Sequence, residues 1–298
     1  QAGFRGWQQG QAAALAWFDA LVQDEPVLAQ HPAVALGRAF NLRQLGNDKE
    51  ALEAYQEVAL RAGNSRWGRF AQAQIRLLSP EPGRPTAALP LGARIHPLIG
   101  QMVIDGRLDE PVWGRADHLT LVRQTGRPSD DSLRTTVRLG YDTQYLYVAV
   151  RAAGYVATAA DSPPPNEEHH RAAISADYVE MLLDVDRDGL TCWRIGIDGW
   201  GDFVDSVDDH DFWNLPAEAR VARTVASSPP GTASVIEMAL PLAALFGGQP
   251  QAGHTVGLQI HRRVTARPDR APVHLWWSPP HGASAAPHLF GHATFTAD

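Results

Sequence analysis

The chain has 298 residues, of which 44% are hydrophobic and 20% are charged, and its formal net charge is −7. This composition is that of an ordinary globular protein with enough residues for two domains. The negative charge argues against nucleic-acid binding, which depends on clustered Lys and Arg. The single cysteine, Cys192, excludes a disulfide within the chain and a cysteine-based metal site.

The sequence contains no run of about 18 apolar residues, so we expect no membrane span. The chain begins at Gln1 with neither an initiator Met nor a signal peptide. We therefore expect a processed chain or a fragment of a longer one.

Residues 1–80 are expected to form helices. Apolar residues recur at helical spacing in the segments 11–22, 33–45, 49–62 and 66–78. Gly46 and Gly63 follow two of these segments, at the C-cap position that favours glycine.

The helix pairs resemble tetratricopeptide repeats, which place small residues where two helices cross and a Gly in the turn. Ala39, Ala51 and Tyr55 fall at the spacing of such a crossing, and Gly46 falls in the turn. The resemblance implies that the helical segment docks a protein partner. A plain helical bundle is the alternative interpretation.

Residues 81–98 are rich in Pro and Gly and lack apolar periodicity, so they are expected to be a linker. Residues 99–298 contain many short segments with period-two alternation. The strand candidates are 135–141, 145–150, 178–185, 191–197, 202–206, 220–227, 234–240, 256–263, 273–278 and 292–296. Many short strands without crossover helices predict an antiparallel β-sandwich. The fold class expected for the whole chain is α+β multidomain, with an N-terminal α-helical repeat-like segment followed by the sandwich.

Several short motifs in the sandwich resemble, in the same order, those of carbohydrate-binding module family 9, a family of DOMON-type β-sandwiches. They are Ile104–Glu110 with Trp113, Leu139–Asp142 with Tyr145–Val150, Asp177–Glu180, Ile236–Pro241, Gly257–Ile260, Trp277–Ser278 and Phe290–Gly291. The resemblance implies a glycan-binding or ligand-sensing module and not an enzyme. No Gly-x-Ser-x-Gly, phosphate-loop or His-Glu-x-x-His motif is present.

The resemblance also implies a ligand site. Sugar-binding members sandwich a terminal sugar between two Trp side chains, and polar residues hydrogen-bond its hydroxyls. The polar Glu and Arg of the family map to Glu180 and Arg194, and a family Gln maps to His261. The two Trp positions map to Ile174 and to the Ala283–Ala285 stretch, so both stacking residues are replaced.

Two alternatives for this site remain open. Trp200 and Trp213 lie in a loop-rich stretch after the Arg194 segment and are candidates for a rearranged stacking platform. Glu180 and Arg194 could instead form a cross-strand ion pair that only stabilises the sheet.

Two further ligands are considered. Asp184, Asp186 and Asp188 precede Gly189 and offer alternate oxygen ligands on a tight turn, which suits a structural Ca²⁺; a solvated Asp-rich turn is the alternative. Related sandwiches hold haem b through Met, His or Lys, but Met181 and Met238 lie inside predicted strands and are expected in the core.

The preferred hypothesis is therefore a non-catalytic glycan-binding or ligand-sensing module of an extracytoplasmic protein, whether secreted, periplasmic or on the cell surface. The rival hypothesis is a structural or protein-interaction sandwich in a larger assembly that has lost sugar binding. A haem b electron-transfer domain is the minor alternative.

Overall fold

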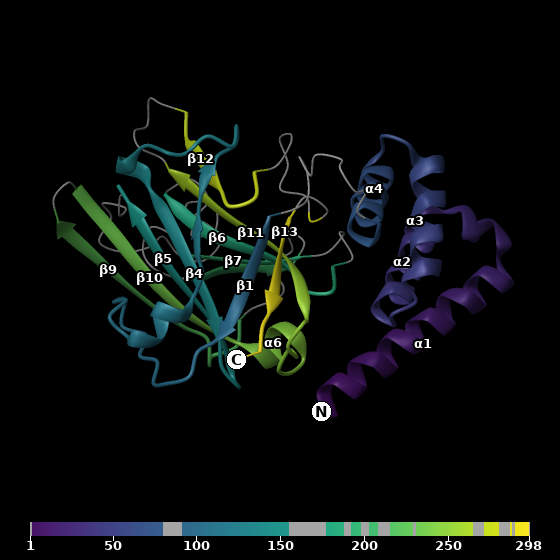
Figure 1. The fold of residues 1–298 in the computed structure, drawn as a ribbon, viewed down its shortest axis with the longest axis horizontal. Helices are drawn as coiled ribbons and strands as arrows, with labels where there is room; N and C mark the ends of the chain where they lie inside the picture. Colours follow the sequence, from purple (N-terminus) through teal and green to yellow (C-terminus); the bar gives the residue numbers. More distant parts are fainter. Residues whose placement is uncertain are drawn as a thin grey trace. The chain divides into compact units, whose positions relative to one another are not determined.

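The computed structural model describes residues 2–79, 91–154, 177–187, 192–197, 203–207, 215–228, 231–264, 271–279, 287 and 290–297. The chain divides into two compact units. One contains Gln1–Pro90 with Asp186–Leu190, and the other contains Leu91–Val185 with Thr191–Asp298. The first unit is helical and the second consists mostly of strands (Figure 1).

The helical unit contains four α-helices and one short 3₁₀ helix among the described residues, in agreement with the predicted helical segments. They are α1 (Ala2–Asp24), η1 (Pro26–Gln30), α2 (Pro32–Gln44), α3 (Asp48–Ala62) and α4 (Arg66–Leu78). The turn after α2 uses Gly46 at φ +84°, a left-handed conformation that glycine adopts without steric cost. Ser65 caps α4, because its side chain accepts a hydrogen bond from the Gly68 amide at 3.3 Å.

Small residues let the helices of this unit approach closely. Ala39 of α2 and Ala51 of α3 are fully buried, and Tyr55 packs edge-on against Phe70 with ring centroids 6.2 Å apart. These side chains form a small core of their own. The helices of this unit therefore bury an apolar face against one another.

The strands of the second unit agree closely with the predicted segments from residue 135 onward. They are β1 (Gly92–Pro97), β2 (His118–Thr120), β3 (Val122–Arg123), β4 (Thr135–Tyr141), β5 (Tyr145–Ala153), β6 (Tyr178–Asp184), β7 (Trp193–Ile197), β8 (Phe203–Val207), β9 (Arg220–Ser228), β10 (Gly231–Pro241), β11 (Thr255–Val264), β12 (Val273–Trp276) and β13 (Gly291–Phe295). The 3₁₀ helices η2 (Pro111–Arg115) and η3 (Asp131–Leu133) and the short helix α6 (Leu242–Phe246) connect them.

The strands form two layers that are joined at one edge. The first layer has the order β8-β7-β6-β11-β13, with β12 beside β11 and β3 beside β12; the second has the order β4-β5-β10-β9, with β2 beside β4. Strand β1 pairs with β13 through Gly92–Ile95 and with β4 through His96–Pro97, so it connects the layers (Figure 1).

Strand β1 corrects two expectations. It lies within the segment 81–98 that was expected to be a linker, so the last part of that segment belongs to the sandwich. It also pairs in parallel with both neighbours, whereas the other pairings among the described strands are antiparallel. Its six residues show only a short alternation, with Ala93 and Ile95 buried, which is too brief to reveal a strand in the sequence.

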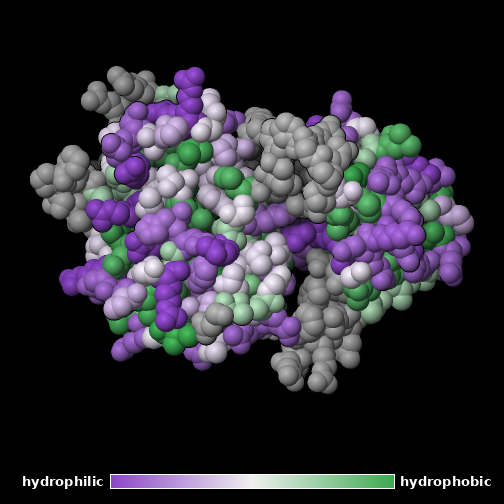
Figure 2. All heavy atoms as spheres, viewed as in Figure 1, coloured by the Kyte–Doolittle hydropathy of each residue, from purple (hydrophilic) through white to green (hydrophobic). Residues whose placement is uncertain are grey.

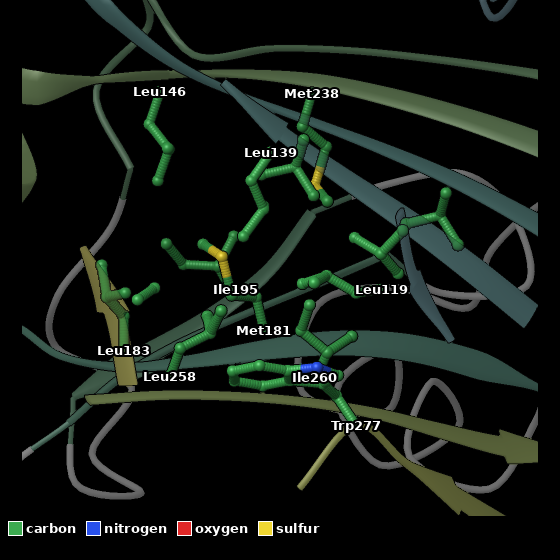
Figure 3. Packing of buried hydrophobic residues seen from close by; sticks show 14 of the residues in the cluster. Leu119, Leu139, Leu146, Met181, Leu183, Ile195, Met238, Leu258, Ile260 and Trp277 are labelled. Atoms are coloured by element: carbon green, nitrogen blue, oxygen red, sulfur yellow. The ribbon is translucent and has the colours of Figure 1, made fainter. Parts of the chain in front are cut away.

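The core fills the space between the two layers. Leu139, Leu146 and Met238 from the β4–β10 layer face Met181 and Leu258 from the β6–β11 layer (Figure 3). Met181 and Met238 are 2% exposed, which confirms that both belong to the core.

A buried arginine ties the two layers together. Arg262 of β11 is 0% exposed, and its Nη2 lies 3.1 Å from Oδ2 of Asp177 just before β6. Its Nη1 donates to Thr135 Oγ1 at 2.9 Å and to the Ala153 carbonyl at 2.8 Å, both on the opposite layer. A buried charge is tolerated only when it is paired and hydrogen-bonded, and Arg262 meets both conditions.

The surface of the sandwich mixes hydrophilic and hydrophobic residues on the side visible in Figure 2. Within the described part of the chain, no helix combines the length and the apolar character needed to cross a membrane.

Candidate functional site

The candidate site lies on the outer face of the β6–β11 layer, the face opposite the core. Side chains alternate between the two faces of a strand, so Val179 and Met181 enter the core while Glu180 points the other way. Glu180 is directly opposite His261 of β11 and Gly196 of β7. The β6–β11 pairing therefore places Glu180 and His261 side by side.

Glu180 is the centre of the site. Its side chain is 6% exposed, and Oε2 accepts a hydrogen bond from Nη1 of Arg194 at 2.6 Å. Its other oxygen, Oε1, lies 2.8 Å from Nδ1 of His261. Arg194 reaches Glu180 diagonally, because its direct partner on β6 is Leu182.

These contacts decide the charge of Glu180. Burial alone would raise the pKa of a carboxyl group, but the hydrogen bond from His261 and the positive charge of Arg194 outweigh it. The net result is that the pKa of Glu180 is lowered, so it is an ionised acceptor at neutral pH. The neighbouring Tyr178 has a raised pKa because of burial and the Glu180 charge, so it keeps its hydroxyl proton.

Two aromatic side chains pack against His261. The indole of Trp276 on β12 stacks on its imidazole, with centroids 3.8 Å apart and planes 16° apart. Tyr178 meets the same ring edge-on at 5.7 Å. His261 Nε2 also lies 2.9 Å from Nδ1 of His274 on β12. Among the described residues, Glu180, His274, Tyr178 and Trp276 therefore all contact the imidazole of His261.

The structure brings together three of the residues predicted for ligand binding, namely Glu180, Arg194 and His261. Trp200 and Trp213 lie outside the described residues, as do Ile174 and the Ala283–Ala285 stretch. Whether an aromatic platform covers the polar cluster therefore stays a prediction.

The predicted Ca²⁺ turn is described only in part. Asp184 is buried, Asp186 is partly exposed, and Asp188 lies outside the described residues. Among the residues that the structure describes, the acidic side chains close enough to share a cation are Asp105, Glu110 and Glu237.

The buried carboxylate of Glu237 has a structural role, because its oxygens already accept hydrogen bonds from the protein. Oε1 accepts from the Trp113 indole at 3.0 Å, and Oε2 accepts from the amides of Gly106 at 2.9 Å and Asp105 at 3.2 Å. These hydrogen bonds attach the segment before η2 to strand β10. Several residues of the family motifs thus hold the scaffold together.

His274 and Trp276 are the site residues that sequence reasoning missed. Their spacing of two residues places both on one face of a predicted strand. The register that sets Trp276 opposite His261 depends on the β11–β12 pairing, which the sequence pattern does not specify.

The fold and the polar cluster define a two-layered β-sandwich with a candidate ligand site on an outer sheet face. Residues 104–297 match the family described as carbohydrate family 9 binding domain-like. The match spans more than half of the chain, and the chain therefore belongs to this family. The resemblance of the sandwich motifs to carbohydrate-binding module family 9 is thereby confirmed.

Three solved structures are similar to this chain. A carbohydrate-binding module of family 9 from Caldicellulosiruptor kristjanssonii in complex with cellotriose matches with 18% identity and a TM-score of 0.47, over 70% of this chain and 94% of that chain. Its complex with glucose matches with 18% identity and a TM-score of 0.46, over 69% and 96% of the two chains. A Bacteroides uniformis protein matches with 13% identity and a TM-score of 0.49, over 69% and 99%. No curated protein matches the chain.

Proposed function

We propose that the sandwich is a non-catalytic saccharide-binding module of an extracytoplasmic protein. We propose that its site is the cluster of Glu180, Arg194 and His261 on the outer face of the β6–β11 layer. The observation that carries the proposal is the buried, ionised carboxylate of Glu180, which fixes the side chains of Arg194 and His261 at 2.6 Å and 2.8 Å. Family membership supports the same conclusion.

The chemistry of the cluster suits a polyol. A guanidinium group offers several N–H donors in a fixed plane, and a carboxylate accepts from hydroxyl groups. The side chain of Arg194 is 33% exposed, so it reaches solvent. Its hydrogen bond to the buried Glu180 carboxylate fixes its orientation. Hydrogen bonds to charged groups contribute about 1.5–3 kcal/mol each. Two hydrogen bonds between a saccharide and the charged groups of the cluster therefore suffice for weak but specific recognition.

Isothermal calorimetry with a panel of neutral and acidic saccharides tests the proposal, and glucose and cellotriose are the first probes. Wild-type protein is compared with Glu180→Gln, which removes the charge that orients Arg194 and His261. Glu218→Gln is the matched control, because Glu218 is exposed on the segment before β9. We expect binding by wild type and Glu218→Gln and at least tenfold weaker binding by Glu180→Gln.

The rival function is a structural or protein-interaction sandwich, and one observation favours it. Glu180 is almost fully buried and is engaged by both neighbours, as in a cross-strand ion pair that only stabilises the sheet. Failure of every saccharide to bind, together with a stable protein partner in a pull-down with the full chain, would favour this function.

For the helical unit we propose docking of a protein partner, in the manner of tetratricopeptide repeats. Support comes from the buried Ala39 and Ala51 at the packed α2–α3 pair and from Gly46 in its turn. A pull-down with residues 91–298 compared with the full chain tests this role. Capture of one defined partner only by the full chain is the expected result, and equal capture by both contradicts it.

A further inference from the structure

A row of three hydrogen-bonded side chains runs across the candidate site. Glu180 Oε1 lies 2.8 Å from His261 Nδ1, and His261 Nε2 lies 2.9 Å from His274 Nδ1. The two imidazole planes differ by only 5°, yet their centroids are 5.1 Å apart. The rings therefore lie edge to edge in nearly one plane, with a single hydrogen between the facing nitrogens.

The ionised carboxylate of Glu180, at one end of the row, determines which ring nitrogens donate and which accept. A carboxylate only accepts hydrogen bonds, so His261 Nδ1 donates to Glu180. When His261 is neutral, one of its nitrogens donates and the other accepts, so its Nε2 accepts from His274 Nδ1. Neutral His274 must then carry its proton on Nδ1, which leaves Nε2 as an acceptor.

We infer that His274 is a further ligand-contacting residue of the site, and that the Glu180–His261–His274 row fixes its Nε2 as a hydrogen-bond acceptor for a saccharide hydroxyl. The ligand contact rests on the proposed function, whereas the direction of the row does not. His274 is partly exposed on the same strand as Trp276, and Nδ1 is already occupied by His261. Within the described part of the chain, Nε2 is therefore the ring nitrogen left for a ligand.

Charged groups around His274 favour this neutral form. Burial lowers the pKa of His274, the neighbouring His261 and the positive charge of Arg263 lower it further, and Glu180 opposes them. Tyr178 and Arg194 face the row from β6 and β7. On the other side of β12, Arg123 of β3 lies opposite the core residue Leu275 and is paired with Asp130 at 3.0 Å.

Protonation reverses the role of the outward nitrogen. When His274 takes up a proton from solvent at Nε2, this atom becomes a donor and the acceptor is lost. A saccharide hydroxyl that donates to Nε2 then loses its partner. We expect binding to weaken about threefold to tenfold as the pH falls from 7.5 to 5, the loss of one neutral hydrogen bond.

Nuclear magnetic resonance of ¹⁵N-labelled histidine in the ligand-free full chain tests the direction of the row. Long-range ¹H–¹⁵N correlations are expected to place the proton of both His261 and His274 on Nδ1 at pH 7.5. A proton on Nε2 of neutral His274 would overturn the inference whether or not any saccharide binds.

Calorimetry with the saccharide panel tests the ligand contact. His274→Phe keeps a ring but removes the acceptor, and His118→Phe is the control at an exposed histidine on β2. We expect His274→Phe to bind threefold to tenfold more weakly than His118→Phe at pH 7.5 and to lose the pH dependence. Equal binding by the two variants overturns the ligand contact and leaves the proposed function standing. If no saccharide binds wild type, the proposed function and this contact fail together, and the resonance result still decides the direction of the row.

Discussion

The Arg262–Asp177 pair gives the sharpest prediction for the fold. Both side chains are at most 1% exposed, and the guanidinium also donates to Thr135 and Ala153 of the opposite layer. Arg262→Met removes the guanidinium that pairs with the buried Asp177 carboxylate, and breaking a buried pair in this way costs about 3–5 kcal/mol in other proteins. For a domain of this size each kcal/mol lowers the melting midpoint by about 2–4 °C, so we expect a fall of roughly 6–20 °C.

A double-mutant cycle in urea, with thermal melting beside it, measures the coupling between the two groups. Asp177→Leu combined with Arg262→Met removes both charges, so we expect the double variant to be more stable than Arg262→Met alone. Arg94→Met is the matched control, because Arg94 pairs with Asp117 on the exposed surface. An equal loss of stability in Arg262→Met and Arg94→Met would refute the claim that a buried ion pair joins the layers.

Three further predictions concern the turn before η2, the response to pH and the predicted metal turn. Gly106→Ala should destabilise the sandwich by about 1–3 kcal/mol in urea unfolding, because φ is +80° and a Cβ would lie 2.9 Å from the Arg223 backbone; wild-type stability in this variant would contradict the assigned conformation. Acidification should lower the melting midpoint in two stages. The pKa of His274 is lowered, so the folded state resists its protonation, and its contribution to folding stability is lost as the pH falls below about 6.5. The pKa of Glu180 is also lowered, so its contribution to folding stability is lost below about pH 4.5. A melting midpoint that rises between pH 6.5 and 5 would contradict this sign. For the turn that contains Asp184 and Asp186, the expected result is a higher midpoint in Ca²⁺ than in EGTA, and an unchanged midpoint rejects a structural ion.

Much of the fold could be predicted because long strands carry a clear period-two pattern. The predicted segment 135–141 coincides with β4, and the predicted 256–263 lies within β11. Strands β2 and β3 were missed because three and two residues show no usable alternation. Strand β1 was missed because it follows a Pro/Gly-rich stretch and its parallel pairing depends on partners far away in sequence.

The family motifs proved to be mainly structural. In the Leu139–Asp142 motif, Asp142 accepts hydrogen bonds from the amides of Gln144 and Tyr145 at 2.7 Å and from the Tyr147 hydroxyl at 2.8 Å. Asp177 holds Arg262, and Glu237 holds the Trp113 indole. These side chains explain why the motifs identify the sandwich and do not by themselves identify its ligand.

The candidate site could be predicted in part. Glu180, Arg194 and His261 were found through the resemblance, and the structure places them in direct contact. The contact of His274 with His261 could not be predicted, because it depends on strand register and on ring orientation. Both are set by packing between β11 and β12, with Trp276 against His261.

The most direct test of saccharide binding at Glu180 is calorimetric titration of the full chain with the saccharide panel, repeated with Glu180→Gln and Glu218→Gln. We expect at least one saccharide to bind to wild type and to Glu218→Gln, and Glu180→Gln to bind it at least tenfold more weakly while remaining folded. Binding that is unaffected by Glu180→Gln would place the site elsewhere, and the absence of binding to any saccharide would contradict the proposed function.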